Sequence, residues 1–173
     1  MDFFEAVAKR GSYRDTFLPD PIPQCDLDRI LTAAIQAPSG YNFQTTAFAV
    51  ITDEQLRQQI AVLMPSKAVS TAPVIVVVLS RHVEQPANGL SFEIEDYAAA
   101  TENLMLAVTA LGYAGVWMDG AMKLENRAAK LRELLHVPQD LHLRTIVPIG
   151  RPVGAVTQKT KQSLSERVTY NRF

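Results

Sequence analysis

The stretch FEIEDYAAATENLMLAVTALG, residues 92–112, carries the longest helical pattern in the sequence, and Gly112 ends it. Apolar side chains recur along one side of this predicted helix at Ile94, Tyr97, Ala98, Leu104, Met105, Val108 and Leu111. The opposite side is also apolar, with Ala99, Ala100, Leu106, Ala107 and Ala110. A helix that is apolar nearly all round is buried nearly all round. Because a small domain has little room to enclose such a helix, we expect its second side to be buried between two subunits.

Strand and helix patterns precede this helix in the chain. The run of β-branched and aliphatic residues from Pro73 to Leu79 predicts a strand that is buried on both faces. A shorter strand is expected from Ala47 to Ile51. Helices are expected at residues 3–10, 26–37 and 53–63. Asp26 and Asp53 are the predicted N-caps of the second and third of these helices.

The part of the chain after the long helix continues the alternation of strands and helices. Residues 113–118 are expected to be extended, and Asp119-Gly120 is expected to form a turn. A helix is predicted at residues 126–135 and a last core strand at residues 143–149. Together these elements favour one domain of the α/β or the α+β class, and the residues alone leave both classes open.

The composition is that of an ordinary globular domain. The chain has 173 residues, of which 47% are apolar and 20% charged. Its net charge of −1 gives no bulk attraction to nucleic acid or to an anionic membrane, and no apolar stretch is long enough to span a bilayer. The N-terminus lacks the pattern of a signal peptide, and the single Cys25 suggests a reducing compartment. We therefore expect a cytoplasmic protein without nucleic-acid or membrane partners.

Several familiar catalytic and binding motifs are absent. The sequence has no G-x-G-x-x-G after a strand, no Walker A loop, no C-x-x-C and no H-E-x-x-H. It also lacks the G-x-S-x-G motif of serine hydrolases. The three histidines, His82, His136 and His142, have no carboxylate or cysteine at ligand spacing, so we expect surface histidines and no metal site.

Two basic clusters are candidates for binding a phosphate. Arg10, Ser12 and Arg14 follow the first predicted helix, and guanidinium groups with a hydroxyl suit a phosphate. Lys159 and Lys161 point to the same side if the tail is extended. Taken separately, these clusters are better explained as a solvated helix end and a solvated tail. Taken together, they could close a cationic pocket around one phosphate.

Two polar segments are candidates for contacting the rest of a ligand. Ser39, Gly40 and Asn42 lie in a non-helical loop that offers several hydrogen-bonding groups, although a turn closed by its own side chains is the simpler explanation. The apolar segment before Asp119 and Gly120 could lay its backbone N–H groups beside a flat ligand. A core strand followed by a turn explains that segment equally well.

The order of these motifs along the chain resembles the flavin-dependent nitroreductase family. The matching positions are Arg10, Ser12 and Arg14, then Ala37, Pro38, Ser39, Asn42 and Gln44, then Glu102, Asn103, Leu104, Leu111 and Gly112, then Asp119 and Gly120, then Pro148, Ile149 and Gly150, and finally Lys159, Lys161 and Leu164. The resemblance covers essentially the whole chain. Among the matches, the A-P-S-x-x-N-x-Q segment together with the basic start is the most specific.

The resemblance implies a fold and an assembly. We expect a nitroreductase-like α+β fold, a three-layer α/β/α sandwich whose central, mostly antiparallel sheet is flanked by helices. Residues 1–173 would form one such domain. The long helix would lie at the interface of a homodimer, and the tail from about residue 151 to residue 173 would pack on the partner subunit.

The resemblance also implies a cofactor and the residues that hold it. Arg10, Ser12 and Arg14 would hold the phosphate and ribityl end of FMN, and Lys159 and Lys161 would complete the phosphate pocket. The FMN contacts from the other subunit would be Pro38, Ser39, Gly40 and Asn42. Asp119 and Gly120 would lie by the flavin N5 atom, with the Gly120 N–H as hydrogen-bond donor. Lys67 would supply a cation near the pyrimidine ring.

The implied activity is an FMN-dependent oxidoreductase that takes a hydride from NAD(P)H and passes it through flavin N5 to a nitroaromatic, a quinone or a similar acceptor by a ping-pong mechanism. The flavin carries the chemistry, so no catalytic side chain is expected. The chain departs from the family at Gln44-Thr45-Thr46, where Q-P-W is common, and it has only residues 81–90 to cover the active site. Three alternatives remain: a flavin-binding protein without turnover, a flavin enzyme of other chemistry such as dehydrogenation, and a cofactor-free interaction protein.

Overall fold

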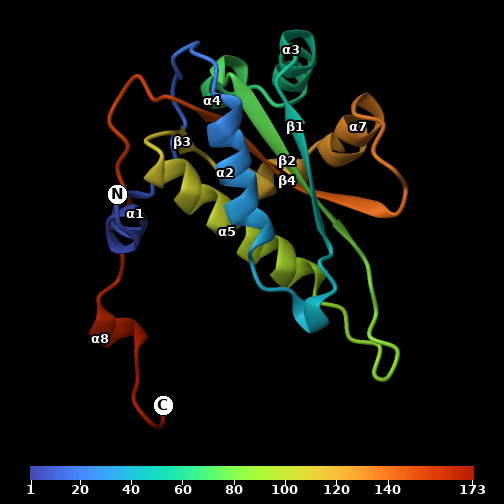
Figure 1. Ribbon diagram of the computed structural model, residues 1–173, viewed down its shortest axis with the longest axis vertical. Coiled ribbons are helices and arrows are strands. Elements are labelled where there is room, and N and C mark those ends of the chain that lie inside the picture. The colour runs from blue at the N-terminus through green and yellow to red at the C-terminus, as the bar shows by residue number, and fades with distance from the viewer.

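The computed structural model describes residues 1–173, and its centre is a four-stranded sheet (Figure 1). The strands are β1 (Thr46–Ile51), β2 (Val74–Arg81), β3 (Ala114–Gly115) and β4 (Leu141–Gly150). They lie in the order β1-β2-β4-β3, and every neighbouring pair is antiparallel. The predicted α+β fold with an antiparallel sheet is thus confirmed.

Strand β2 is the buried centre of the sheet, as its sequence predicts. All of its residues from Val74 to Ser80 are buried, and only Arg81 is exposed. Val74, Val76 and Val78 belong to the apolar core on one face of the sheet, whereas Ile75, Val77 and Leu79 belong to the core on the other face. This alternation follows from the two-residue period of a strand. Two apolar faces require two covering layers of helices.

One layer consists of α2 (Gln24–Ile35) and α5 (Glu93–Ala110). Leu27, Ile30 and Ala34 of α2 and Leu104, Met105 and Val108 of α5 are buried in the core of this face. The helix α1 (Phe3–Lys9) packs against α5 at the edge of the layer. The predicted long helix is therefore present, and most of its apolar stripe faces the sheet, but Ile94 near its start is 57% exposed.

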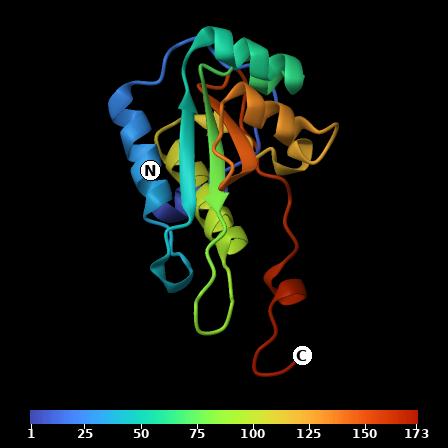
Figure 2. The same ribbon diagram turned by 90° about the vertical axis from the view of Figure 1, so that its right-hand side faces the viewer.

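The other layer consists of α3 (Glu54–Leu63), α4 (Lys67–Thr71) and α7 (Arg127–Leu134). Ile60, Ala68, Val69 and Leu131 are buried in the core of this face. Figure 2 shows the sheet edge with α2 on one side and α7 on the other. The three-layer α/β/α arrangement is confirmed.

The helices agree with the sequence prediction at one of the following places and differ from it at two. Asp53 caps α3 as predicted, since its side chain accepts from the Leu56 N–H (2.8 Å). Asp26 does not cap α2, which starts earlier at Gln24; its carboxylate accepts from the Tyr113 hydroxyl instead (2.7 Å). The helix α4 was not predicted because its five residues are too few to show a period.

The segment after α5 also differs from its prediction. Only Ala114 and Gly115 of the expected extended segment 113–118 pair as β3. The predicted turn at Asp119-Gly120 is wrong, because these two residues begin the short helix α6 (Asp119–Met122). A dipeptide that is typical of turns is equally compatible with the first turn of a helix, where acidic residues are favoured.

The tail after β4 first runs past the end of α1, and from about residue 159 it leaves the body of the molecule (Figures 1 and 2). It carries the short helix α8 (Leu164–Arg167), which is closed by a capping box between Ser163 and Glu166. Residues 159–173 are all exposed, including the apolar Leu164, Tyr170 and Phe173. None of the helices of the protein combines the length and the apolar character needed to cross a membrane.

The buried centre of β2 gives the first prediction. Ile75 has no solvent-exposed surface, so Ile75→Ala leaves a cavity and should lower the free energy of unfolding by about 2–5 kcal/mol. The matched control is Val62→Ala on α3, where the side chain is 81% exposed and the change should stay within about 0.5 kcal/mol. Urea denaturation measures both values. Equal losses for the two variants would contradict the assignment of β2 to the core.

Candidate functional site

Three segments that are distant in sequence line an open hollow of about 680 Å³. They are the loop after α1, the start of α4 and the beginning of the C-terminal tail. The lining residues are Ser12, Tyr13, Arg14, Asp15, Lys67, Gly154, Ala155, Thr157 and Lys159. Four predicted site residues therefore come together here: Ser12, Arg14, Lys67 and Lys159.

Tyr13 holds two of these segments together. Its backbone N–H donates to the Gly115 carbonyl (2.9 Å), which ties the loop to β3. The Tyr13 side chain is buried; its hydroxyl donates to the Thr16 carbonyl (2.8 Å) and accepts from the Gly154 N–H (3.1 Å). The loop after α1 and the start of the tail are thus fixed relative to each other and to the sheet.

The tail passes closely over the end of α1. A Cβ atom on Gly11 would lie 2.6 Å from the Thr157 carbonyl oxygen, so a residue with a side chain would push the tail away. The Gln158 side-chain amide donates to the carbonyls of Val7 (2.8 Å) and Arg10 (3.0 Å). These contacts bring Thr157 and Lys159 into the wall of the hollow.

The hollow is positively charged. Arg14, Lys67 and Lys159 contribute three cations, and Asp15 contributes one carboxylate. Lys67 Nζ lies 3.1 Å from Asp15 Oδ1. The Lys67 ammonium, followed by the Thr16 backbone N–H, holds the pKa of Asp15 below its ordinary value. The hollow therefore presents an excess of positive charge to any ligand that enters it.

An apolar recess of about 270 Å³ adjoins the hollow, and Arg14 lines both. Its other lining residues are Ser66, Ala68, Val116, Trp117, Met118, Gly120 and Ala121. Gly120 is the second residue of α6, so its N–H has no acceptor within the helix. A Cβ atom on Gly120 would meet no other atom within 4 Å, which leaves its backbone open to a ligand.

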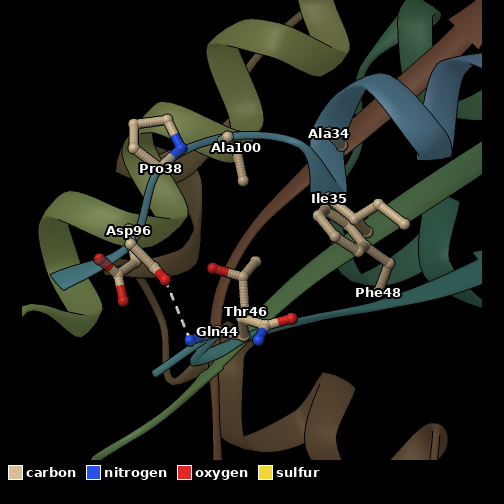
Figure 3. A pocket seen from close by; sticks show the side chains of 10 residues that line it. Ala34, Ile35, Pro38, Gln44, Thr46, Phe48, Asp96 and Ala100 are labelled. Carbon is tan, nitrogen blue, oxygen red and sulfur yellow. Dashed lines mark hydrogen bonds between the residues drawn. The ribbon is translucent and has the colours of Figure 1, made fainter. Parts of the chain in front are cut away.

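The polar loop at residues 38–44 forms a different pocket, of about 240 Å³ (Figure 3). Pro38, Ser39 and Gln44 line it together with apolar side chains of α2, β1 and α5. The Ser39 hydroxyl accepts from the Gln44 backbone N–H (3.0 Å), which closes the loop on itself. The loop contains the 3-10 turn η1 (Gly40–Asn42), in which Asn42 has a positive φ of 56°.

Buried contacts hold η1 in place. Asp96, which is only 4% exposed, accepts from the Gly40 N–H (2.8 Å) and from the Thr45 hydroxyl (2.6 Å). Phe92 packs so closely on Gly40 that a Cβ atom at residue 40 would clash with the Phe92 ring. The role of Asp96 in holding this loop was not predicted, although an acidic residue on a mainly apolar helix stands out in the sequence.

Within one chain, the loop at residues 38–44 and the hollow are separate. Their lining residues do not overlap, and η1 (cyan) lies at the lower end of the molecule in Figure 1 whereas α4 lies at the upper end. The remaining predicted residues are also outside the hollow. Arg10 pairs with Glu102 (3.3 Å), Asp119 pairs with Lys123 (3.4 Å), and Lys161 is exposed on the tail.

A polar network that the sequence did not reveal lies next to η1. His82 Nδ1 lies 2.7 Å from Glu93, and His82 Nε2 lies 3.1 Å from Glu84. Glu93 also accepts from Arg144 (2.6 Å). The hydrogen bond with Glu84, and next the one with Glu93, raise the pKa of His82. The network fastens the loop after β2 to the start of α5, where Phe92 packs on Gly40.

Comparison with known proteins finds a matching family and several similar proteins. The profile of the Nitroreductase family matches residues 7–66 and 61–151. A relative from Methanothermobacter thermautotrophicus, whose name includes NAD(P)H nitroreductase, is 30% identical over 156 residues, which are 88% of this chain and 78% of the relative.

Two solved structures share the fold. A nitroreductase family protein from Clostridium novyi is 28% identical, with a TM-score of 0.76 over 88% of this chain and 86% of that one. The NADPH:FMN oxidoreductase from Vibrio harveyi, solved with NAD+, is 21% identical, with a TM-score of 0.83 over 99% of this chain and 77% of that one.

The His82 network gives a pH-dependent prediction. Because the pKa of His82 is raised in the folded state, its contacts stabilise the fold fully below the ordinary value of 6.5, and this stabilisation is lost as the pH rises through the folded-state value. The difference in unfolding free energy between the wild type and His82→Gln should therefore be largest near pH 6 and shrink above it. Urea denaturation at several pH values measures it, and a difference that grows with pH would refute the network.

Proposed function

Because this chain belongs to the nitroreductase family, we propose that it binds FMN and passes a hydride from NAD(P)H through flavin N5 to an electrophilic acceptor, a nitroaromatic, a quinone or a similar compound, by a ping-pong mechanism. The chain is a nitroreductase-family oxidoreductase, so the alternative of a cofactor-free interaction protein is excluded. The observation that carries the cofactor proposal is the cationic hollow that joins an apolar recess at Arg14.

The two cavities fit the two ends of FMN. The hollow, which offers cations and the Ser12 hydroxyl, suits the phosphate, because guanidinium and ammonium groups form strong charge-assisted hydrogen bonds to phosphate oxygens. The recess, walled by Val116, Trp117 and Met118, suits a flat aromatic ring system. Together, the recess of about 270 Å³ and the hollow of about 680 Å³ fall within the range of about 300–1,000 Å³ that is common for ligand pockets.

The residues of this chain would bind and orient the cofactor. Arg14 and Lys159 would neutralise the phosphate, and Lys67 would place a positive charge near the pyrimidine ring. The Gly120 N–H would donate a hydrogen bond in the recess, with Asp119 beside it. When bound, FMN supplies hydride acceptance and donation at N5. The protein would contribute positioning and electrostatic stabilisation, and no side chain would act as a nucleophile.

The choice of NAD(P)H as reductant is supported by the family and by the open recess. A ping-pong enzyme needs no separate nucleotide site, since reductant and acceptor can use the same face of the cofactor in turn. The name of the Vibrio harveyi relative, which was solved with NAD+, agrees with this choice.

Two alternatives keep the cofactor, namely flavin binding without turnover and a different reaction such as dehydrogenation. Bleaching of bound flavin by NADH, followed by recovery with an acceptor, would favour the reductase.

We propose a homodimer in which the partner subunit completes the site. Pro38, Ser39, Gly40 and Asn42 would reach the flavin only from a second copy, because within one chain the loop at residues 38–44 and the hollow are separate. A groove beside α5 is lined by apolar side chains of α1, α2 and α5, including Phe3, Leu106 and Ala110. Phe4 on α1 is 81% exposed as well. An apolar surface of this kind is typical of a protein interface.

The C-terminal tail would pack on the partner subunit. Its apolar Leu164, Tyr170 and Phe173 gain nothing from exposure to water, and the tail extends away from its own domain (Figure 2). In the dimer this tail would also bring Lys161 toward a phosphate site. The whole chain would then act as one domain whose last segment belongs structurally to the neighbouring subunit.

We also propose a cytoplasmic location. Cys25 is exposed and is the only cysteine, so it has no disulfide partner within the chain. A free exposed thiol is typical of proteins in a reducing compartment. This agrees with a reaction that consumes NAD(P)H.

Cofactor binding gives a direct prediction. Arg14→Gln should weaken FMN binding about tenfold, because it removes a charge-assisted hydrogen bond to the phosphate at an exposed site. Riboflavin, which lacks the phosphate, should be affected much less. Quenching of flavin fluorescence measures both affinities. Lys130→Gln, which removes a cation on α7 outside the hollow, is the control. A wild type that binds no FMN, or an Arg14→Gln variant that equals the control, would refute the proposed site.

The dimer gives a second prediction. Leu106→Glu places a charge in the apolar groove and should convert the homodimer to monomers, because an unpaired buried charge costs several kcal/mol. Size-exclusion chromatography with light scattering measures the mass, and circular dichroism checks the fold. Val62→Glu on α3, where the side chain is 81% exposed, should remain dimeric. A monomeric wild type or a dimeric Leu106→Glu variant would contradict the proposed interface.

A further inference from the structure

The cationic hollow contains one residue whose charge opposes its proposed ligand. Asp15 lies in the lining beside Arg14, Lys67 and Lys159. A carboxylate next to a phosphate is repulsive, and nothing in the fold requires an acid at this exposed position. Its side chain is 63% exposed and no buried group depends on it. The position of Asp15 therefore needs an explanation that involves its partner, Lys67.

The two members of this ion pair are held very differently. Asp15 Oδ1 accepts from the Thr16 backbone N–H (2.9 Å) and lies 3.3 Å from the Thr16 hydroxyl, so its orientation is fixed by its own neighbour. Lys67 Nζ contacts only Asp15 (3.1 Å), and the lysine side chain is 71% exposed. If the pair opens, Asp15 keeps its contacts with the Thr16 backbone N–H and hydroxyl, whereas the Lys67 side chain can adopt other rotamers. Lys67 is thus the member that can move.

The energetics favour an exchange of partners. An exposed ion pair contributes little to stability, so opening it has a low cost. The hollow has three cations and one carboxylate, so its net charge of +2 attracts an anionic nucleotide as a whole. The Asp15 carboxylate is charged at neutral pH, and the Lys67 ammonium lowers its pKa further, so Lys67 has a charged partner before the cofactor arrives.

We propose that Asp15 is an internal competitor for Lys67: it holds the lysine in the cofactor-free protein and gives it up when the anionic flavin nucleotide binds. This inference rests on the proposed function, since it takes FMN as the ligand of the hollow. Asp15 is thereby a residue that sets cofactor affinity. It lowers the affinity for FMN because each binding event must separate the Asp15–Lys67 pair and leave the carboxylate close to the ligand.

A double-mutant cycle tests the exchange. The variants are Asp15→Asn, Lys67→Met and the double variant, and the readout is the FMN dissociation constant from fluorescence quenching of the cofactor-free protein. Asparagine keeps the side-chain oxygen that accepts from Thr16, so the loop should retain its shape. Asp20→Asn, which changes the same charge at an exposed position outside the hollow, controls for net charge. Thermal unfolding of each cofactor-free variant checks that it is folded.

Asp15→Asn is expected to tighten FMN binding about two- to fivefold in the wild-type background, the range expected for an exposed ion pair. In the Lys67→Met background the gain should be clearly smaller, because no ion pair has to be separated and only the direct repulsion between Asp15 and the ligand is relieved. An unchanged or weaker affinity for Asp15→Asn would overturn the proposal. So would an equal gain in both backgrounds, because it would mean that Asp15 acts by direct repulsion. A wild type that binds no FMN would refute the proposed function as well, whereas the other two results refute only the competition.

Discussion

The complete burial of β2 is the constraint on which the rest of the structure depends. Seven consecutive residues, Val74 to Ser80, have almost no contact with solvent, so both of their backbone edges must be paired and both of their faces covered. β1 and β4 supply the pairing, and the helices of the two layers supply the cover. The long helix α5 is needed for one of these faces, which fixes its start near η1 and its end near β3.

The position of the candidate site follows from the place where the sheet ends, at β3 and the end of β4. β3 pairs with the end of β4, and the loop after α1 is bonded to β3 through Tyr13. The chain leaving β4 then passes over Gly11, which has room for it because it lacks a side chain. These two segments meet the start of α4 in the hollow, and each of the three contributes one cation: Arg14, Lys159 and Lys67. The apolar recess begins where the same edge meets α6, so charge and flat apolar surface lie side by side.

Elements with a local sequence signal could be predicted from the sequence. The strand β2 and the helix α5 were correct because a continuous apolar run and a long helical period can each be recognised without knowing the fold. The joining of Ser12, Arg14 and Lys159 in one hollow was expected from the order of motifs in a known family, and the structure brings them together within one chain.

The features that were missed depend on contacts between distant residues. Asp96 bonds to Thr45 across 51 positions, and Lys67 bonds to Asp15 across 52. Neither partner can be recognised from its own surroundings in the sequence. The α6 helix was missed for a different reason, because its four residues are too few to produce a period. The partner of the loop at residues 38–44 cannot be found in one chain at all if it belongs to a second subunit.

The central claim is that two copies of the chain build one flavin site. A crystal structure of the protein with FMN tests it most directly. The account predicts a homodimer in which the phosphate contacts Arg14 and Lys159 of one subunit, while Ser39 or Asn42 of the other subunit contacts the flavin ring. A flavin enclosed by residues of a single subunit, or a dimer that leaves the loop at residues 38–44 far from the hollow of its neighbour, would contradict it.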